Sequence, residues 1–192
     1  VGRDVLLEFK VAAFLPTGCL FKQIYNTCSA LYDLELTFQF IENKNWYGFA
    51  SLAYVGKQGR SVGLCDYTQV HLVPMGLGIK YFAPTRLGDF YVGLGVQPEF
   101  VGTNNCSEFV QKNTSQWGCG GIGKLGFNFD LPHSWYCDLF VDYSFVWVGC
   151  CGEMSSCSSL SNSSNCTDSP FVVPVKANVS GAILGVGFGY KF

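Results

Sequence analysis

The sequence has few charged residues, no long apolar run and no excess of basic side chains. Asp, Glu, Lys and Arg make up 14% of its 192 residues, against about a quarter in ordinary soluble domains. A net charge of −2 leaves no basic surface of the kind that nucleic acid requires, so nucleic acid is not an expected partner. No apolar run approaches the roughly 20 residues of a membrane helix, which excludes a helical membrane protein.

Aromatic residues, glycine and cysteine are abundant instead. Aromatic residues make up 16% of the chain, and there are 23 glycines and 10 cysteines. Few charges combined with many aromatic side chains indicate an outer surface that faces something other than water. The cysteine content favours an oxidising compartment. The length predicts a single domain over residues 1–192, and residues 1–4 show no signal-peptide pattern.

Eight segments alternate between apolar and polar residues with a period of two, which is typical of β-strands. They span residues 5–15, 31–41, 46–55, 67–82, 89–101, 118–129, 135–147 and 178–192. Long and short connections alternate between them: 16–30, 42–45, 56–66, 83–88, 102–117, 130–134 and 149–175. This pattern predicts an all-β, eight-stranded antiparallel up-and-down transmembrane β-barrel, with both termini periplasmic and four long extracellular loops. Pro74 cannot donate to a strand ladder, so we expect a bulge or distortion there.

The last segment has two distinct faces. One face is apolar and carries Ala182, Leu184, Val186, Phe188, Tyr190 and Phe192. The other is mostly glycine and carries Gly181, Ile183, Gly185, Gly187, Gly189 and Lys191. Such a strand would be a poor edge in a soluble protein, because its unpaired backbone invites aggregation. We therefore expect it to close the barrel.

In the other segments the charged residues lie opposite the apolar face. They are Glu8, Lys10, Asp33, Glu35, Lys80, Glu99, Lys124, Asp138 and Asp142. A soluble lipocalin also has eight strands, with its apolar face inside. Here the polar face mixes charges with glycines, and the apolar face has aromatic rings near both strand ends. Both features favour a barrel whose apolar face contacts lipid. Because such a barrel has room inside only for side chains, we expect a salt-bridged lumen. A narrow or sideways-opening path is the alternative.

Three segments carry a family resemblance. They are residues 73–81 (VPMGLGIKY), residues 90–96 (FYVGLGV) and the final strand, which ends on Phe192. They resemble the small eight-stranded barrels of bacterial outer membranes, of the OmpX/OmpA type and the OmpW-like group. The resemblance implies an outer-membrane location, contact with the lipid bilayer and lipopolysaccharide, and a terminal signal read by the barrel-insertion machinery. That signal consists of Phe188, Tyr190 and Phe192.

The cysteines depart from this family, whose members have few or none. Nine fall at the loop end of the predicted strands: Cys19, Cys28, Cys65, Cys106, Cys119, Cys150, Cys151, Cys157 and Cys166. We expect disulfides that brace the long loops, with Cys19–Cys28 and Cys106–Cys119 as natural local pairs. Cross-links between molecules are an alternative, whereas the spacings of the cysteines and the absence of histidine from the long loops disfavour a metal site. Cys137, on the apolar face near the turn end, is expected to be a buried or lipid-facing thiol.

Histidine is too scarce for the known chemistry of such barrels. Small membrane barrels that are enzymes use a histidine with a serine or an aspartate near the membrane surface. The two histidines are His71, which has no obvious partner, and His133, which lies beside Ser134 in a predicted turn. We expect no catalytic residue, no metal and no cofactor.

The predicted function follows from the two ends of the barrel. A filled lumen beneath long cysteine-rich loops favours a structural or surface-interaction role, in which the loops serve envelope integrity, adhesion or antigenic display toward a host or envelope protein. Residues 149–175 would be the main presented surface. Passive transport of small or hydrophobic solutes and a soluble ligand-binding barrel are the alternatives.

Overall fold

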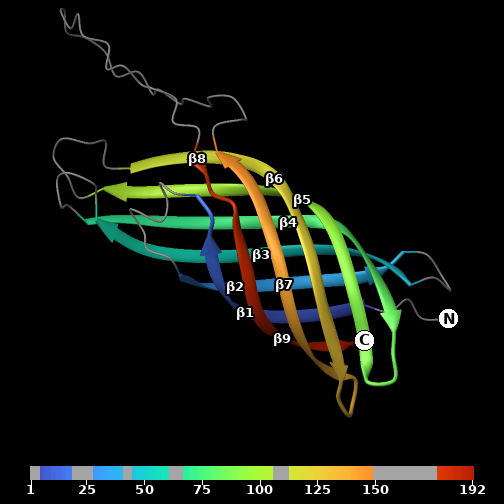
Figure 1. Ribbon diagram of the computed structural model, residues 1–192. Helices are drawn as coiled ribbons and strands as arrows, with labels where there is room; N and C mark the ends of the chain where they lie inside the picture. Colours follow the sequence, from blue (N-terminus) through green and yellow to red (C-terminus); the bar gives the residue numbers. More distant parts are fainter. Residues whose placement is uncertain (1–4, 19–27, 41–44, 61–66, 106–112, 149–176) are drawn as a thin grey trace, which may run out of the picture.

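The computed structural model describes residues 5–18, 28–40, 45–60, 67–105, 113–148 and 177–192. Nearly all of them lie in antiparallel strands of one sheet (Figure 1). The strands are β1 (Val5–Pro16), β2 (Ser29–Gln39), β3 (Trp46–Arg60), β4 (Tyr67–Pro84), β5 (Gly88–Asn105), β6 (Asn113–Asp130), β7 (Trp135–Val148), β8 (Ala177–Asn178) and β9 (Gly181–Lys191). No helix in this part of the chain is long and apolar enough to cross a membrane.

The sheet closes on itself into a barrel. Each strand from β1 to β7 pairs with the next, and β9 pairs with both β7 and β1. β8 and β9 occupy one strand position, because β8 continues the register of β9 along β7. The strand breaks at Ser180, whose hydroxyl accepts a hydrogen bond from the Val146 N–H at 3.1 Å. The predicted eight-stranded antiparallel barrel and its closure by the last strand are confirmed.

Several strands run further toward the loop end than predicted. Residues 56–60, 102–105 and 113–117 belong to β3, β5 and β6, so the predicted loops 56–66 and 102–117 are too long. These extensions contain many glycine and polar residues and lack a continuous apolar face, which is why alternation failed to find them. Backbone pairing continues through them, as for Gly56 opposite His71.

Pro74 disturbs the sheet without adding a residue. The β3–β4 ladder pairs Leu52 with Met75 and resumes with Val55 opposite Leu72 in the same register. The ladder is thus interrupted rather than bulged, because proline lacks the N–H that the ladder needs. The expected distortion is present, and a bulge in these pairings is not.

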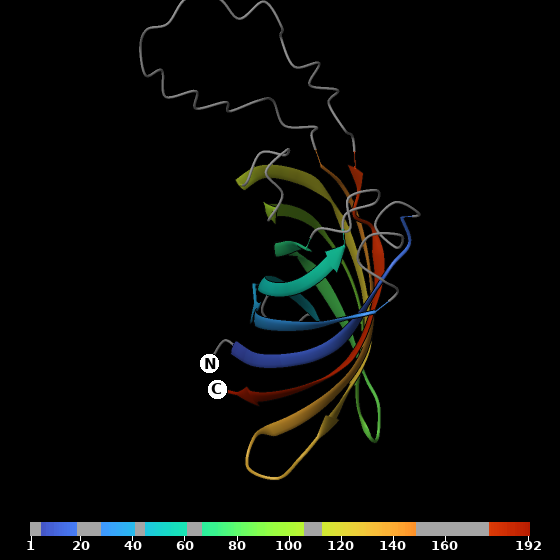
Figure 2. The same ribbon diagram turned by 90° about the vertical axis from the view of Figure 1, so that its left-hand side faces the viewer.

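Two short connections that the structure describes in full lie at the turn end of the barrel, and β1 begins and β9 ends at the same end (Figures 1 and 2). The Phe192 N–H donates to the Val5 carbonyl at 2.9 Å. Gly88 has a φ of +148°, and a Cβ there would strike the Asn128 carbonyl, so this turn requires glycine. His133 and Ser134, both with φ of 63°, form the other turn.

Candidate functional site

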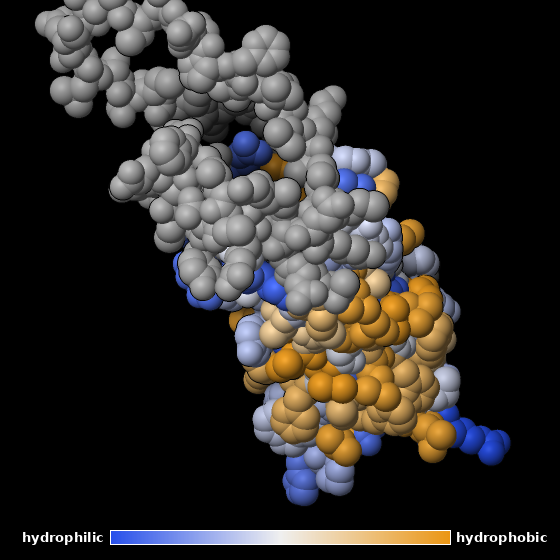
Figure 3. Space-filling model, turned by 60° about the vertical axis from the view of Figure 1, so that its left-hand side comes forward, coloured by the Kyte–Doolittle hydropathy of each residue, from blue (hydrophilic) through white to orange (hydrophobic). Residues whose placement is uncertain are grey.

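The outer face of the barrel is apolar. Alternate residues along the strands, such as Leu7, Phe9 and Val11, are 41–52% exposed, while the intervening side chains are buried. Figure 3 shows the resulting band of hydrophobic side chains on the visible wall, with hydrophilic residues at its lower edge. The prediction that the apolar face points outward is therefore confirmed, and the lipocalin alternative, which needs an apolar face inside, does not fit.

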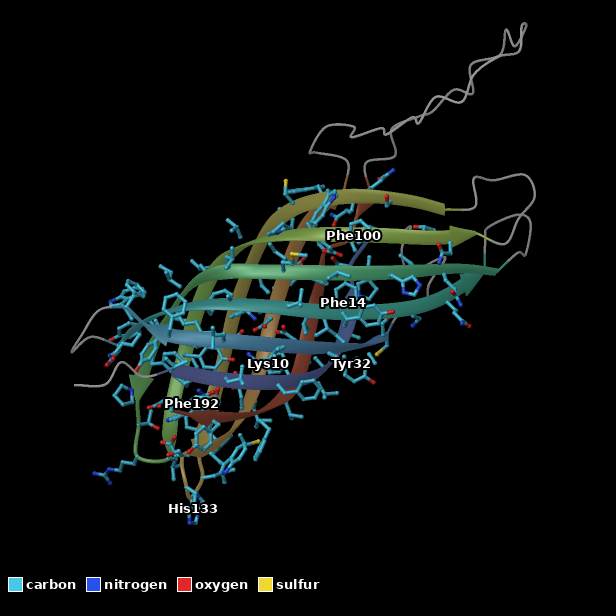
Figure 4. The ribbon with its side chains drawn as sticks, turned by 180° about the vertical axis from the view of Figure 1, so that it is seen from behind. Lys10, Phe14, Tyr32, Phe100, His133 and Phe192 are labelled. Carbon is cyan, nitrogen blue, oxygen red and sulfur yellow. The ribbon has the colours of Figure 1, made fainter. Side chains whose placement is uncertain are left out.

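Aromatic rings gather near both ends of this face. At the turn end Trp135 stacks on Phe188, with ring centroids 4.8 Å apart, and meets Tyr190 edge-on at 5.0 Å. Tyr190 in turn meets Phe192 at 4.8 Å. The three residues predicted as an insertion signal thus form one row of rings with Trp135. Figure 4 shows Phe192 and His133 toward this end, Tyr32 and Phe100 toward the other, and Lys10 between them.

Aromatic rings also gather at the loop end, as expected, and they include Trp117. Phe100 meets Trp117 at 5.4 Å, and Phe145 meets Trp147 at 4.0 Å. Trp117 was assigned to a loop because the residues before it show no apolar alternation, so its place on the outer face was missed. Aromatic side chains at both ends of an apolar band are typical of membrane interfaces.

The inner face holds the nine charged residues that the sequence placed on the polar side, and all are at most 6% exposed. Glu35 lies at the centre, because all three buried lysines reach it. Its carboxylate is 3.3 Å from Lys10 Nζ and 2.9 Å from Lys124 Nζ, and Lys80 Nζ also pairs with it. Burial of these charges is tolerable only because they are paired.

Further carboxylates surround the same lysines. Lys10 Nζ lies 3.4 Å from Glu8 and 3.5 Å from Asp138, and Lys124 Nζ lies 3.0 Å from Asp142. Asp33 is the most distant partner, at 4.0 Å from Lys124 Nζ. Of the nine, Glu99 forms no ion pair with any residue that the structure describes.

The strand register explains why the sequence assembles this cluster. Glu8 lies directly opposite Glu35, a pairing of like charges that is unfavourable unless a cation lies between them. Lys10, two residues further along β1, supplies that cation. The glycines opposite the lysines leave room for the long side chains: a Cβ on Gly93 would lie 2.9 Å from Lys80 Cγ, and one on Gly187 would contact Glu8 Oε1.

Two tyrosines extend the network toward the turn end. Tyr91 donates to Asp138 Oδ2 at 2.7 Å, and Tyr136 lies over the bare Gly189 of β9. Periodicity placed both rings on the polar face, but neither was recognised as part of the network. At the rim, Lys191 Nζ reaches Asp89 at 3.3 Å and Asp130 at 2.6 Å. These polar contacts fill the lower half of the lumen.

The upper half of the lumen is filled by apolar side chains. This layer consists of Phe14, Leu31, Val55, Val70, Leu72, Val148, Val179 and Ile183, all at most 5% exposed. This apolar layer lies between the charged residues and the loop end. Phe14 is near the last residue of β1, and Leu31 and Val70 are near the first residues of β2 and β4. Charged and apolar layers stacked in this way pack the described part of the lumen with buried side chains.

The barrel has a small hollow inside and a larger one on its outer wall. A small cavity of about 20 Å³ lies inside, where Asp33, Gln97 and Asp142 meet the apolar layer. A groove of about 550 Å³ lies on the outer wall and is lined by exposed apolar residues such as Leu94 and Tyr143. The outer groove does not cut through the wall, because the β5–β6 and β6–β7 ladders beneath it are continuous.

The cysteines lie mostly outside the described residues. Of the nine disulfide candidates, Cys28 and Cys119 are described and both are exposed. The other seven lie outside the described residues: Cys19, Cys65, Cys106, Cys150, Cys151, Cys157 and Cys166. Cys137 is half-buried on the outer face, opposite Phe188 on β9. The bracing of the loops by disulfides therefore stays a prediction.

The two histidines lie in different places, one on the outer wall and one in a turn. His71 Nδ1 lies 2.7 Å from the Tyr54 hydroxyl on the outer wall, a partner that was not obvious from the sequence. Alternation left the faces of β3 ambiguous, and this hid Tyr54. His133 is exposed in its turn. No group of three or more His, Cys, Asp or Glu side chains suited to a metal ion occurs among the described residues.

Comparisons with known proteins identify the fold. No protein-family model and no curated protein matches the chain. Among solved structures, Ail, the attachment invasion locus protein of Yersinia pestis, matches with a TM-score of 0.59 and 13% identity, and each chain is covered in full. A major outer membrane protein from Thermus thermophilus has a TM-score of 0.55 and 14% identity, again with full coverage of both. Neisserial surface protein A has a TM-score of 0.54 and 13% identity over both whole chains.

Proposed function

We propose that this barrel, whose fold is that of small outer-membrane proteins, is a structural platform that presents its loop end for interaction outside the cell. The filled lumen is the observation that carries the proposal. Lys10, Lys80 and Lys124 tie together acids from three different strands, and the apolar layer lies above them. A barrel packed in this way supports function at its surface rather than through its interior.

The outer face supports a bacterial outer-membrane location. Its apolar band and two groups of aromatic rings suit a lipid bilayer with lipopolysaccharide, with the turn end and both termini toward the periplasm. The row formed by Phe188, Tyr190 and Phe192 is the proposed contact of the barrel-insertion machinery. The loop end then faces the outside, where disulfides would brace the connections between strands.

The partner is proposed to be a host or envelope protein bound by the loops. One structural neighbour is by name an attachment invasion locus protein and another a surface protein, and a role of that kind suits a barrel without a path through it. Residues 149–175, the predicted main surface, lie outside the described residues. The lumen gives no support to a channel, and no described group supports catalysis.

The test compares adherence of bacteria that display the chain with that of bacteria displaying a variant without residues 150–175. Surface adherence is expected to fall to the level of cells without the protein. A variant with the turn residues 131–134 replaced by Asn-Gly is the control, because it alters the opposite end of the same β-barrel. Equal adherence of all three strains would contradict the proposal, provided that heat-modifiable gel mobility shows folded barrels in each.

A further inference from the structure

Four strands carry a polar outer face beyond the aromatic rings of the loop end. β3, β4, β5 and β6 reach further in this direction than the strands beside them, since the described β2–β3 pairs stop at Tyr54 and the described β6–β7 pairs at Gly118 (Figure 1). Along these extensions, outward residues form two rows that cross the strands. The first row consists of Gly56, His71, Gly102 and Ser115, and the second of Gln58, Gln69 and Asn104. We refer to these residues as the polar wall.

The polar wall lies on the outside of the barrel. Tyr54 is 46% exposed on the outer face, and its hydroxyl meets His71 Nδ1 at 2.7 Å, so the His71 ring points outward as well. Residues directly opposite one another on neighbouring strands share a face, and so do residues two apart along one strand. Both rows therefore continue the outer wall that carries the apolar band.

Exposed aromatic rings border the polar wall on the side of the apolar band. Phe100, which lies toward the loop end in Figure 4, meets Trp117 with ring centroids 5.4 Å apart, and Trp117 is 47% exposed. A Cβ added at Gly102 would lie 3.6 Å from the Phe100 ring. The bare backbone at Gly102 thus adjoins an aromatic ring on one side, and Asn104 follows on the other side along β5.

The carboxamide groups form a row of their own. Gln58 lies opposite Gln69, and Gln69 lies opposite Asn104, so β3, β4 and β5 contribute one each. Gln58 and Asn104 are exposed, and Gln69 is half-buried. Because a carboxamide both donates and accepts hydrogen bonds, this row suits a ligand with many hydroxyl groups.

Aromatic rings beside carboxamides favour a sugar as that ligand. A ring face packs against the apolar C–H groups of a pyranose, while carboxamides form hydrogen bonds with its hydroxyl groups. Apart from His71, the polar wall contains no ionisable side chain, so these residues offer no lysine or arginine to a phosphate or a sulfate. The surface therefore suits the uncharged hydroxyl groups of a sugar rather than an anionic substituent.

The direction in which the polar wall faces indicates where the sugar comes from. The wall is part of the side of the barrel, so it faces along the membrane toward neighbouring lipids rather than away from the cell. Aromatic rings mark the depth at which the apolar part of a bilayer meets the head groups, and the polar wall begins just beyond them. In the outer leaflet of an outer membrane, the head groups at this level are the sugars of lipopolysaccharide.

We propose that the polar wall, together with Phe100 and Trp117, binds the core oligosaccharide of a neighbouring lipopolysaccharide molecule through its hydroxyl groups. This inference rests on the outer-membrane location proposed above, with the loop end outside. On β5 the two rows lie two and four residues beyond Phe100, which is about 7 and 13 Å along the strand. The wall would thus contact the part of the core nearest to the lipid.

The test is saturation-transfer NMR of the whole chain refolded in micelles of deuterated detergent. The probe is core oligosaccharide that is released from purified lipopolysaccharide by mild acid and then freed of phosphate with hydrofluoric acid. Irradiation of the protein methyl groups is expected to transfer saturation to the sugar protons beyond the level seen with empty micelles. Phosphorylated core is expected to bind with the same dissociation constant, because phosphate has no cationic partner on the polar wall.

Two pairs of substitutions locate the binding. Gln58→Ala with Asn104→Ala removes two exposed carboxamides and is expected to raise the dissociation constant about tenfold, the combined effect of two modest hydrogen bonds. Thr103→Ala with Gln116→Ala alters side chains on the other face of the same strands and should leave the dissociation constant unchanged. Heat-modifiable gel mobility shows whether each variant is folded. Equal weakening of binding by the two pairs would overturn the proposal.

Three outcomes with the wild-type barrel would also overturn it, and they need no variant. One is the absence of saturation transfer to the dephosphorylated core beyond that of empty micelles. Another is binding of the phosphorylated core alone, or of a heparin fragment in its place, which would indicate an anion site. The third is tighter binding of an N-acetyllactosamine tetrasaccharide, which would assign the wall to the sugars of another cell. All these measurements use micelles without cells, so failure of this inference and failure of the adherence role are distinguishable.

Discussion

Replacement of Glu35 by alanine tests the lumen network most severely. Glu35 is fully buried and is the shared partner of three lysines. Without it, Lys10 and Lys124 keep other carboxylates, but Lys80 keeps none among the described residues. Removal of one partner from a buried ion pair costs about 3–5 kcal/mol, because a buried charge is left uncompensated. That cost corresponds to a rise in the unfolding equilibrium constant of roughly 150-fold to 5000-fold.

The double variant Glu35→Met, Lys80→Met separates charge from packing. It removes both partners of one pair and replaces them with apolar side chains of similar length. We expect it to be more stable than Glu35→Ala, because no lysine is left unpaired. The rim supplies the control: Asp130→Ala breaks an ion pair of the half-exposed Lys191, and such surface pairs contribute at most about 1 kcal/mol.

The assay is urea unfolding in micelles, followed by tryptophan fluorescence and by heat-modifiable gel mobility. The reasoning predicts that Glu35→Ala loses several times more stability than Asp130→Ala, and that the double variant recovers part of the loss. If Glu35→Ala and Asp130→Ala were equally stable, the lumen would be hydrated rather than packed, and the argument from the buried network would fail.

The remaining predictions concern packing, insertion and thiols. Gly95→Ala places a Cβ 2.5 Å from the Leu77 carbonyl and 2.9 Å from the Phe49 ring, and should lose about 1–3 kcal/mol of stability in the same urea assay. The control is Gly123→Ala on the outer face of β6, opposite Leu94. Its Cβ would meet only Leu94, at 3.9 Å, and the variant should stay within about 0.5 kcal/mol of wild type. Equal losses from the two variants would refute the inward assignment of Gly95. Replacement of both Tyr190 and Phe192 by alanine should slow insertion into lipid vesicles, measured by the rate at which the heat-modifiable form appears. The control Leu131→Ala, in a turn, should insert at the wild-type rate. An unchanged insertion rate in the double variant would count against the insertion signal. A membrane-permeant maleimide should label Cys137 in intact cells faster than a charged maleimide does, and equal rates would place Cys137 in water.

The sequence predicted the architecture because a barrel wall between two environments enforces alternation. Phe9 meets the outside and Lys10 the lumen, so a period of two is visible in single residues. The extensions of β3 and β6 escaped because residues such as Gly56 and Ser115 are held by backbone pairing and need no apolar face. Strand ends beyond an apolar band leave no hydrophobic pattern to read.

The sequence predicted which residues face the lumen, but it did not predict which of them contact one another. Period-two counting placed Glu35 and the lysines on one side. The meeting of three lysines at Glu35 depends on the registers between strands that are distant in sequence. The contact of Tyr91 with Asp138 depends on such registers as well. The partnership of Tyr54 with His71 likewise required the β3–β4 register. Side-chain reach across a closed sheet is three-dimensional information that local periodicity does not contain.

Single-channel recording in a planar lipid bilayer tests the central claim, that the lumen is filled and the barrel acts through its surface. The protein is refolded in micelles, shown to be folded by heat-modifiable mobility, and added to a bilayer under an applied potential. The account predicts incorporation without conductance steps. Stable, reproducible steps from the wild-type barrel would contradict it, because they require a continuous path through the layer of Phe14 and Leu72 and past Lys10 and Glu35.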